Sequence, residues 1–148
     1  MKAIVTIFAA FGLSLAHAES LTCEADFQKA ITSARSEDIL TAETNCSSDA
    51  SKLCQQITSG DVKRMCLLAS AKGVNFALTE GRGTQKCLNA ANSADPTRRS
   101  FYNAINDCYE QIDVCFDLPS AEESRRCYLN GEYAGYMAAK EFSAGHNH

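Results

Sequence analysis

Apolar residues along this chain recur at intervals of three and four positions, and almost never in strict alternation. The best-marked stripe consists of Ile39, Ala42, Cys46, Ala50, Leu53 and Ile57. A second stripe consists of Phe101, Ile105, Cys108, Ile112 and Cys115. Steps of three and four place residues on one face of an α-helix, whereas a half-buried strand alternates with period two. We therefore predict an all-α fold without a sheet.

Each of these two helices is expected to have a shorter helix before it and a third helix after it. The short helices begin near Cys23 and Cys87, and the third helices start at Ser59 and Ser120. Ser120 followed by Glu123 is a capping box, in which the hydroxyl accepts a backbone N–H bond and the carboxylate reaches back. The Gly-Arg-Gly segment at 81–83 predicts the joint after the first three helices.

The cysteine spacing indicates an internal duplication. The gaps are 22, 7 and 11 residues in one set and 20, 6 and 11 in the other. The two sets are Cys23, Cys46, Cys54 and Cys66, and Cys87, Cys108, Cys115 and Cys127. Self-similarity at a fixed offset is typical of repeated structural units. We predict a disulfide-stapled helical bundle built from two similar three-helix units, 19–82 and 83–148, the second ending in a polar C-terminal tail.

Residues 1–18 have the pattern of a secretory signal peptide, with a basic start, an apolar run and the cleavage motif Ala16-His17-Ala18. The apolar run is too short to cross a bilayer, so we expect no membrane span. An even number of cysteines in an exported chain implies disulfides. Leu, Ile, Val and Phe make up only about 17% of 19–148, so the core is thin. Four disulfides of roughly 3 kcal/mol each would compensate. We expect a secreted, extracellular protein.

Helix geometry suggests a pairing among the 105 that eight cysteines allow. If the second and third helices form an antiparallel hairpin, residues equally far from the turn near Pro119 face each other. Cys108 then pairs with Cys127, and Cys115 is left for Cys87. By symmetry, the first unit would contain Cys46–Cys66 and Cys23–Cys54.

Groups needed for catalysis are missing from the predicted units. After signal cleavage, the histidines are His146 and His148, both in the expected tail, so a Ser–His or Cys–His site has no base. Two ligands on a tail make a poor metal site, and no glycine-rich phosphate loop is present. The net charge of −4 argues against nucleic-acid binding. We therefore expect no enzyme activity, no cofactor and no metal.

The tyrosines are confined to the second unit, at Tyr102, Tyr109, Tyr128, Tyr133 and Tyr136. Tyrosine combines a wide apolar ring with a polar tip, which suits binding surfaces. Gly131 and Gly135 lie four residues apart and would let another backbone approach closely. We predict that a Tyr-rich surface of the second unit binds a protein partner or a small ligand. The alternative is that these rings replace aliphatic residues in the core.

The spacing Cys108-x6-Cys115-x11-Cys127-Tyr128, with its echo in the first unit, resembles the insect secreted domains named after the tsetse EP protein. Members of that family are helical and rich in cysteine. The resemblance implies extracellular residence and transfers no site residues.

Two further functions fit a small, acidic, disulfide-bonded chain. One is an extracellular carrier of small apolar ligands, as in the insect odorant-binding proteins, whose cysteine spacings differ from these. The other is a periplasmic immunity or inhibitor protein against a toxin enzyme. The motif Asn45-Cys46-Ser47 makes Asn45 a candidate glycosylation site and favours eukaryotic secretion, although a paired Cys46 would hinder its use.

Overall fold

The computed structural model describes residues 20–146, and every regular element in that range is helical. The elements are α1 (Cys23–Ser33), α2 (Ser36–Gln55), α3 (Gly60–Leu78), α4 (Gln85–Asn92), α5 (Arg99–Tyr109), the 3₁₀ helix η1 (Glu110–Asp117) and α6 (Ala121–His146). The all-α prediction is confirmed. The predicted signal peptide, 1–18, lies outside the described residues.

Polar side chains begin α3 and α6 where the sequence predicts. The Ser59 hydroxyl accepts a hydrogen bond from the Val62 N–H at 3.4 Å. The Ser120 hydroxyl accepts one from the Glu123 N–H at 3.1 Å and donates to the Glu123 carboxylate at 2.9 Å. Both serines thus satisfy N–H groups that the first helical turn leaves without a partner.

The end of the chain is more ordered than the sequence predicts. α6 continues to His146, and Ser143 is buried, with its hydroxyl donating to the Leu53 carbonyl oxygen of α2 at 3.5 Å. The segment predicted as a polar tail is therefore helical as far as His146, and its residues 144–146 are exposed. The small residues Ala139 and Ser143 share a face that keeps this end of α6 against α2. His148 lies outside the described residues.

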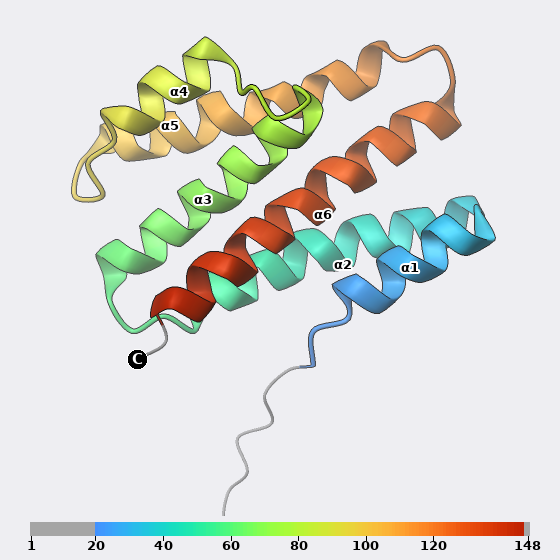
Figure 1. The fold of residues 1–148 in the computed structure, drawn as a ribbon, viewed down its shortest axis with the longest axis horizontal. Coiled ribbons are helices and arrows are strands. Elements are labelled where there is room, and N and C mark those ends of the chain that lie inside the picture. Colours follow the sequence, from blue (N-terminus) through green and yellow to red (C-terminus); the bar gives the residue numbers. More distant parts are fainter. Residues whose placement is uncertain (1–19, 147–148) are drawn as a thin grey trace, which may run out of the picture.

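An antiparallel pair, α3 and α6, forms the centre of the fold (Figure 1). The hairpin of α1 and α2 packs mainly on α6, and the hairpin of α4 and α5 packs mainly on α3. The third helix of each predicted unit therefore contacts the first two helices of the other unit. The backbone reverses at the predicted joint, where Gly81 and Gly83 have φ values of 79° and 71°, which glycine adopts without strain.

The crossing of α3 and α6 is close because small residues meet there. A Cβ atom at Gly73 would lie 2.7 Å from the carbonyl oxygen of Ala134. Gly135 faces Ser70, while Gly131 faces Val74. These two contacts are equivalent under the predicted offset of 61, because Gly135 corresponds to Val74 and Ser70 corresponds to Gly131. The close approach predicted beside Gly131 and Gly135 thus occurs within the chain, and the approaching backbone is that of α3.

Two buried clusters contain residues at equivalent positions of the two predicted repeats. One cluster joins Ala30, Ile39 and Ala42 of the first hairpin to Leu129 of α6. Another contains the equivalent residues Ala94, Phe101 and Ala104, joined to Leu68 of α3. These matched sets are what a duplicated sequence would produce, and the duplication stays a prediction. The predicted boundary at 82 does not separate two cores, because each of these clusters draws on both sides of it.

The second predicted repeat has one residue fewer between its middle cysteines, and η1 compensates for the difference. Seven residues separate Cys46 from Cys54, but six separate Cys108 from Cys115. A 3₁₀ helix advances about 2.0 Å and turns about 120° per residue, against about 1.5 Å and 100° for an α-helix. The eight α-helical steps from Cys46 to Cys54 span about 12 Å and about 800° of rotation. The seven steps from Cys108 to Cys115, which pass from the end of α5 into η1, span about 13 Å and a similar rotation. The tighter winding of η1 keeps Cys115 in the place that Cys54 holds in α2.

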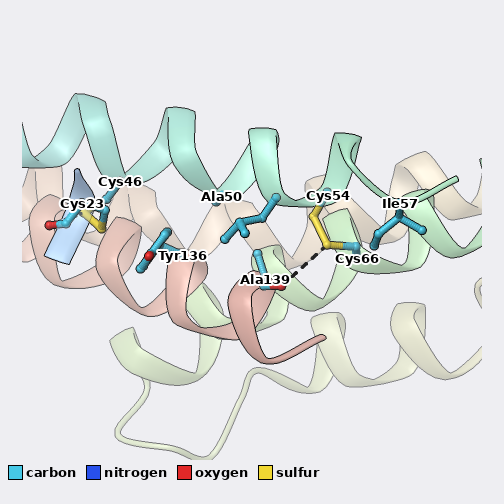
Figure 2. Packing of buried hydrophobic residues seen from close by; sticks show 9 residues of the cluster. Cys23, Cys46, Ala50, Cys54, Ile57, Cys66, Tyr136 and Ala139 are labelled. Carbon is cyan, nitrogen blue, oxygen red and sulfur yellow. Dashed lines mark hydrogen bonds between the residues drawn. A yellow bond between two sulfur atoms is a disulfide. The ribbon is translucent and has the colours of Figure 1, made fainter. Parts of the chain in front are cut away.

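All eight cysteines form disulfides, in the same pattern in both repeats. Cys23–Cys46 and Cys87–Cys108 join the first two helices, with Cα atoms 4.5 and 4.4 Å apart. Cys54–Cys66 and Cys115–Cys127 bridge the turn to the third helix, with Cα atoms 5.4 and 5.5 Å apart. Figure 2 shows the two bonds of the first repeat along α2, with Tyr136 and Ala139 of α6 packed between them.

The predicted pairs Cys23–Cys54, Cys46–Cys66, Cys87–Cys115 and Cys108–Cys127 are therefore wrong. The error lies in the assumed hairpin of second and third helices. Because α3 leaves α2 to pack on α5 and α6, the two helices are close only near their turn. Cys54 and Cys66 lie close to that turn and can meet, whereas Cys46 lies too far along α2.

A non-reducing tryptic map would test this pairing. The peptide that ends at Lys29 should be joined to 36–52, and 53–63 should be joined to 65–72. A link between 36–52 and 65–72 would contradict it. Cys108 and Cys115 share the peptide 100–125, so the second repeat needs a further cut at Glu110 or Asp113.

Substitution of Gly73 should weaken the central crossing. In Gly73→Ala, the new Cβ meets the Ala134 carbonyl, and overpacking of this kind costs about 1–3 kcal/mol. Thermal denaturation should show a lower midpoint. The control is Gly145→Ala near the end of α6, whose Cβ would meet no atom within 4 Å. An unchanged midpoint for Gly73→Ala would contradict the close packing.

Candidate binding groove

A groove runs between α2 and α5, above a floor formed by α3 and α6. Its volume is about 280 Å³. It is lined by Ser47, Ala50, Ser51, Leu67, Ser70, Ala71, Tyr102, Ile105, Tyr109 and Glu132. The groove exists because α2 and α5 pack on different central helices and do not pack against each other.

The two walls of the groove differ in chemistry. The α2 wall carries the short side chains of Ser47, Ala50 and Ser51, while the α5 wall carries Tyr102 and Tyr109 with Ile105 between them. The two tyrosines are seven residues apart, about two helical turns, so they lie on one face of α5. The sequence predicted these two rings as part of a binding surface, and the structure places both beside a hollow.

The other three predicted tyrosines lie elsewhere. Tyr136 is buried, and its hydroxyl donates to Glu24 at 3.2 Å. Tyr133 stacks on Phe27 with ring centroids 3.8 Å apart. Tyr128 meets Phe116 edge to face, with centroids 5.3 Å apart. The five tyrosines therefore do not form one surface, and a binding role for any of them stays a prediction.

Glu132 of α6 is the charged side chain that lines the groove within the described part of the chain. It is 8% exposed, and the Ser47 hydroxyl is its hydrogen-bond partner. Burial raises its pKa to about 7; the negative charge of Glu43 adds to this effect, and the bond from Ser47 opposes it. In residues 20–146, no lysine or arginine forms an ion pair with Glu132.

A second hollow joins the groove at Glu132. It has a volume of about 710 Å³ and shares Ser47, Ser51 and Glu132 with the groove. Along α2 it extends to Glu43 and Lys52. Burial raises the pKa of Glu43, while Arg125 acts in the opposite direction. Glu132 thus lies where a larger, polar hollow meets the narrower tyrosine-walled groove.

The sequence interpretation missed Glu132, although a signal was present. Leu129, Glu132 and Tyr136 are spaced by three and four along α6, so they share its buried face. A carboxylate on a buried helix face is uncommon enough to need an explanation. The equivalent position in the first repeat is the buried Ala71, at offset 61.

Asn45, the predicted glycosylation site, and His146 both contact neighbouring side chains. The Nδ2 of Asn45, which would carry a glycan, donates to the Asp26 carboxylate at 2.7 Å. The His146 ring stacks on Phe142, with centroids 4.2 Å apart. Among residues 20–146, no three His, Cys, Asp or Glu side chains form a group that could hold a metal ion.

The raised pKa of Glu132 makes a prediction about stability. Between about pH 4.5 and 7 the folded state binds this proton more tightly than the unfolded state, so Glu132 lowers stability as the pH rises through that window. Glu132→Gln should be about as stable as the parent protein at pH 4 and about 2–3 kcal/mol more stable at pH 8. Urea denaturation at both pH values would measure this.

The matched control is Glu141→Gln, which removes an exposed carboxylate from the same helix. It should leave the pH dependence close to that of the parent protein. A Glu132→Gln variant with no gain in stability at pH 8 would show that this carboxyl is better solvated than its burial indicates.

No protein-family model, curated protein sequence or solved structure matches this chain. The tsetse EP resemblance therefore stays a prediction. The four disulfides are consistent with an extracellular protein. No helix within residues 20–146 is long and apolar enough to cross a membrane.

Proposed function

We propose that this protein is a secreted, non-catalytic binding protein that takes a small ligand into the groove between α2 and α5. The observation that carries the proposal is the groove itself: an apolar, tyrosine-bearing wall faces short side chains, and the floor adds the Glu132 carboxyl and the Ser70 hydroxyl. Small-molecule sites are typically concave and largely apolar, with a few polar groups that orient the ligand.

Three features of the chain favour an extracellular location. Residues 1–18 have the pattern of a signal peptide. Disulfides form and persist in oxidising compartments, and eight paired cysteines are consistent with one. The cysteine spacing that resembles the tsetse EP domains supports the same location.

The chemistry of the groove favours an amphipathic ligand over a purely apolar one. The groove is open, and its floor carries Glu132 together with the Ser70 hydroxyl. A purely apolar molecule would cover this carboxyl without giving it a polar partner, which is unfavourable. The groove therefore supports binding of an amphipathic ligand better than it supports a carrier of purely apolar ligands.

Binding of a neutral naphthalene-based fluorescent probe would test whether the groove takes ligands. Ser51→Leu fills the space opposite the tyrosines, and Tyr102→Ala removes a ring that is 55% exposed. Ser51→Leu should weaken probe binding because its side chain takes the space of the probe. Tyr102→Ala should weaken it about five- to thirtyfold, since an aromatic contact of this kind contributes about 1–2 kcal/mol. The control Asn103→Leu adds the same side chain on an exposed part of α5 that does not line the groove.

Unchanged binding to Ser51→Leu would place the probe elsewhere and contradict the proposal. Because Tyr102 is half exposed, its replacement should leave the thermal midpoint nearly unchanged. A large loss of stability would instead show that this ring serves the core.

A further inference from the structure

We infer that the ligand of this groove is a small organic amine in its protonated form, with Glu132 as the counter-ion of its ammonium group. This inference rests on the proposed function and names the ligand class for that site. A primary alkyl- or arylalkylamine has the required parts: one positive charge at the end of a small apolar body.

Glu132 is buried, at 8% exposure, on the floor of the groove. A carboxylate removed from water needs a positive partner or several hydrogen bonds to be stable in its ionised form. Here the Ser47 hydroxyl bonds to it, and no cation of the described residues pairs with it. An ammonium group in the groove would provide the charge that the fold does not.

The groove also offers partners for the rest of an amine. An ammonium group has three N–H donors. Beside the carboxylate of Glu132, the hydroxyls of Ser47, Ser51 and Ser70 line the same space and can accept hydrogen bonds. The Tyr102 and Tyr109 rings can cover the apolar body, and the face of a tyrosine ring attracts a cation.

The charges around Glu132 set how binding depends on pH. From α2, Glu43 and Lys52 line the adjoining hollow, and Arg125 of α6 acts on Glu43. From α3 and α5 the groove lining contains no charged residue among those described, although the Tyr109 hydroxyl is titratable. Glu132 is therefore the group in the lining that changes charge near neutral pH, where its pKa lies at about 7.

An amine stays protonated across this range, but it pairs only with the ionised form of Glu132. Binding at pH 6 must therefore displace a proton, whereas binding at pH 8 need not. We expect the dissociation constant to be about tenfold higher at pH 6 than at pH 8. Acidification would then release the ligand.

Calorimetric titration with n-hexylamine and hexan-1-ol would test the inference. The two probes share an apolar body and differ in charge. At pH 8, hexylamine should bind the parent protein more tightly than hexanol does. Hexylamine should bind Glu132→Gln at least tenfold more weakly than it binds the parent protein. Hexanol should bind both proteins alike. At pH 6, titrations in buffers of different ionisation enthalpy should show proton release by the parent protein only.

The control Glu141→Gln removes an equal charge from α6 at a position that does not line the groove. This variant should bind hexylamine as tightly as the parent protein does. Circular dichroism would verify that each variant is folded. Equal hexylamine affinity for Glu132→Gln and the parent protein would overturn the inference. If hexanol or the naphthalene probe still binds, the proposed function survives that result. If hexylamine, hexanol and the naphthalene probe all fail to bind, both proposals fail.

Discussion

The close crossing of α3 and α6 is the constraint on which the other contacts depend. Gly73 lies against the backbone at Ala134, and Gly131 and Gly135 receive Val74 and Ser70, so the two helices approach closely at their crossing. Each of the two then extends beyond its own hairpin and packs on the hairpin of the other repeat. This exchange joins the two repeats into one structure, because neither hairpin has a third helix of its own to cover it.

The disulfides supplement a core that is made largely of small side chains. Many of the buried core residues are alanine or cysteine, which bury little area apiece. The bonds Cys23–Cys46 and Cys87–Cys108 close the two hairpins, and the two shorter loops tie each hairpin to its departing helix. In the chain-entropy view, each disulfide lowers the conformational entropy of the unfolded chain. For loops of this size, this raises the free energy of the unfolded state by about 3 kcal/mol per bond. Covalent closure therefore supplements a core of small side chains.

The groove follows from the same exchange. Because α2 lies on α6 and α5 lies on α3, a space opens between the outer helices above the crossing. The two predicted repeats differ at equivalent positions here: Glu132 occupies the position of Ala71, and Tyr109 that of Ser47. A buried carboxyl without a cation lowers stability at neutral pH, and groups that lower stability in this way often serve a binding site. These differences give the groove a carboxyl on its floor and an aromatic wall on one side.

The sequence by itself determined the helices, their caps at Ser59 and Ser120, the glycine turn and the participation of every cysteine in disulfides, because these depend on short-range periodicity, hydrogen bonding and composition. It also identified Tyr102 and Tyr109 as candidates for a binding surface. Only the tertiary structure decided which cysteines pair, which helix Gly131 and Gly135 admit, and which tyrosines share a hollow. These features depend on α3 leaving α2, a choice between neighbours of similar apolar character that local pattern does not encode. The spacing along α6 marks Glu132 as a carboxylate on a buried face, but its surroundings come from α2, α3 and α5, which are distant from it in the chain.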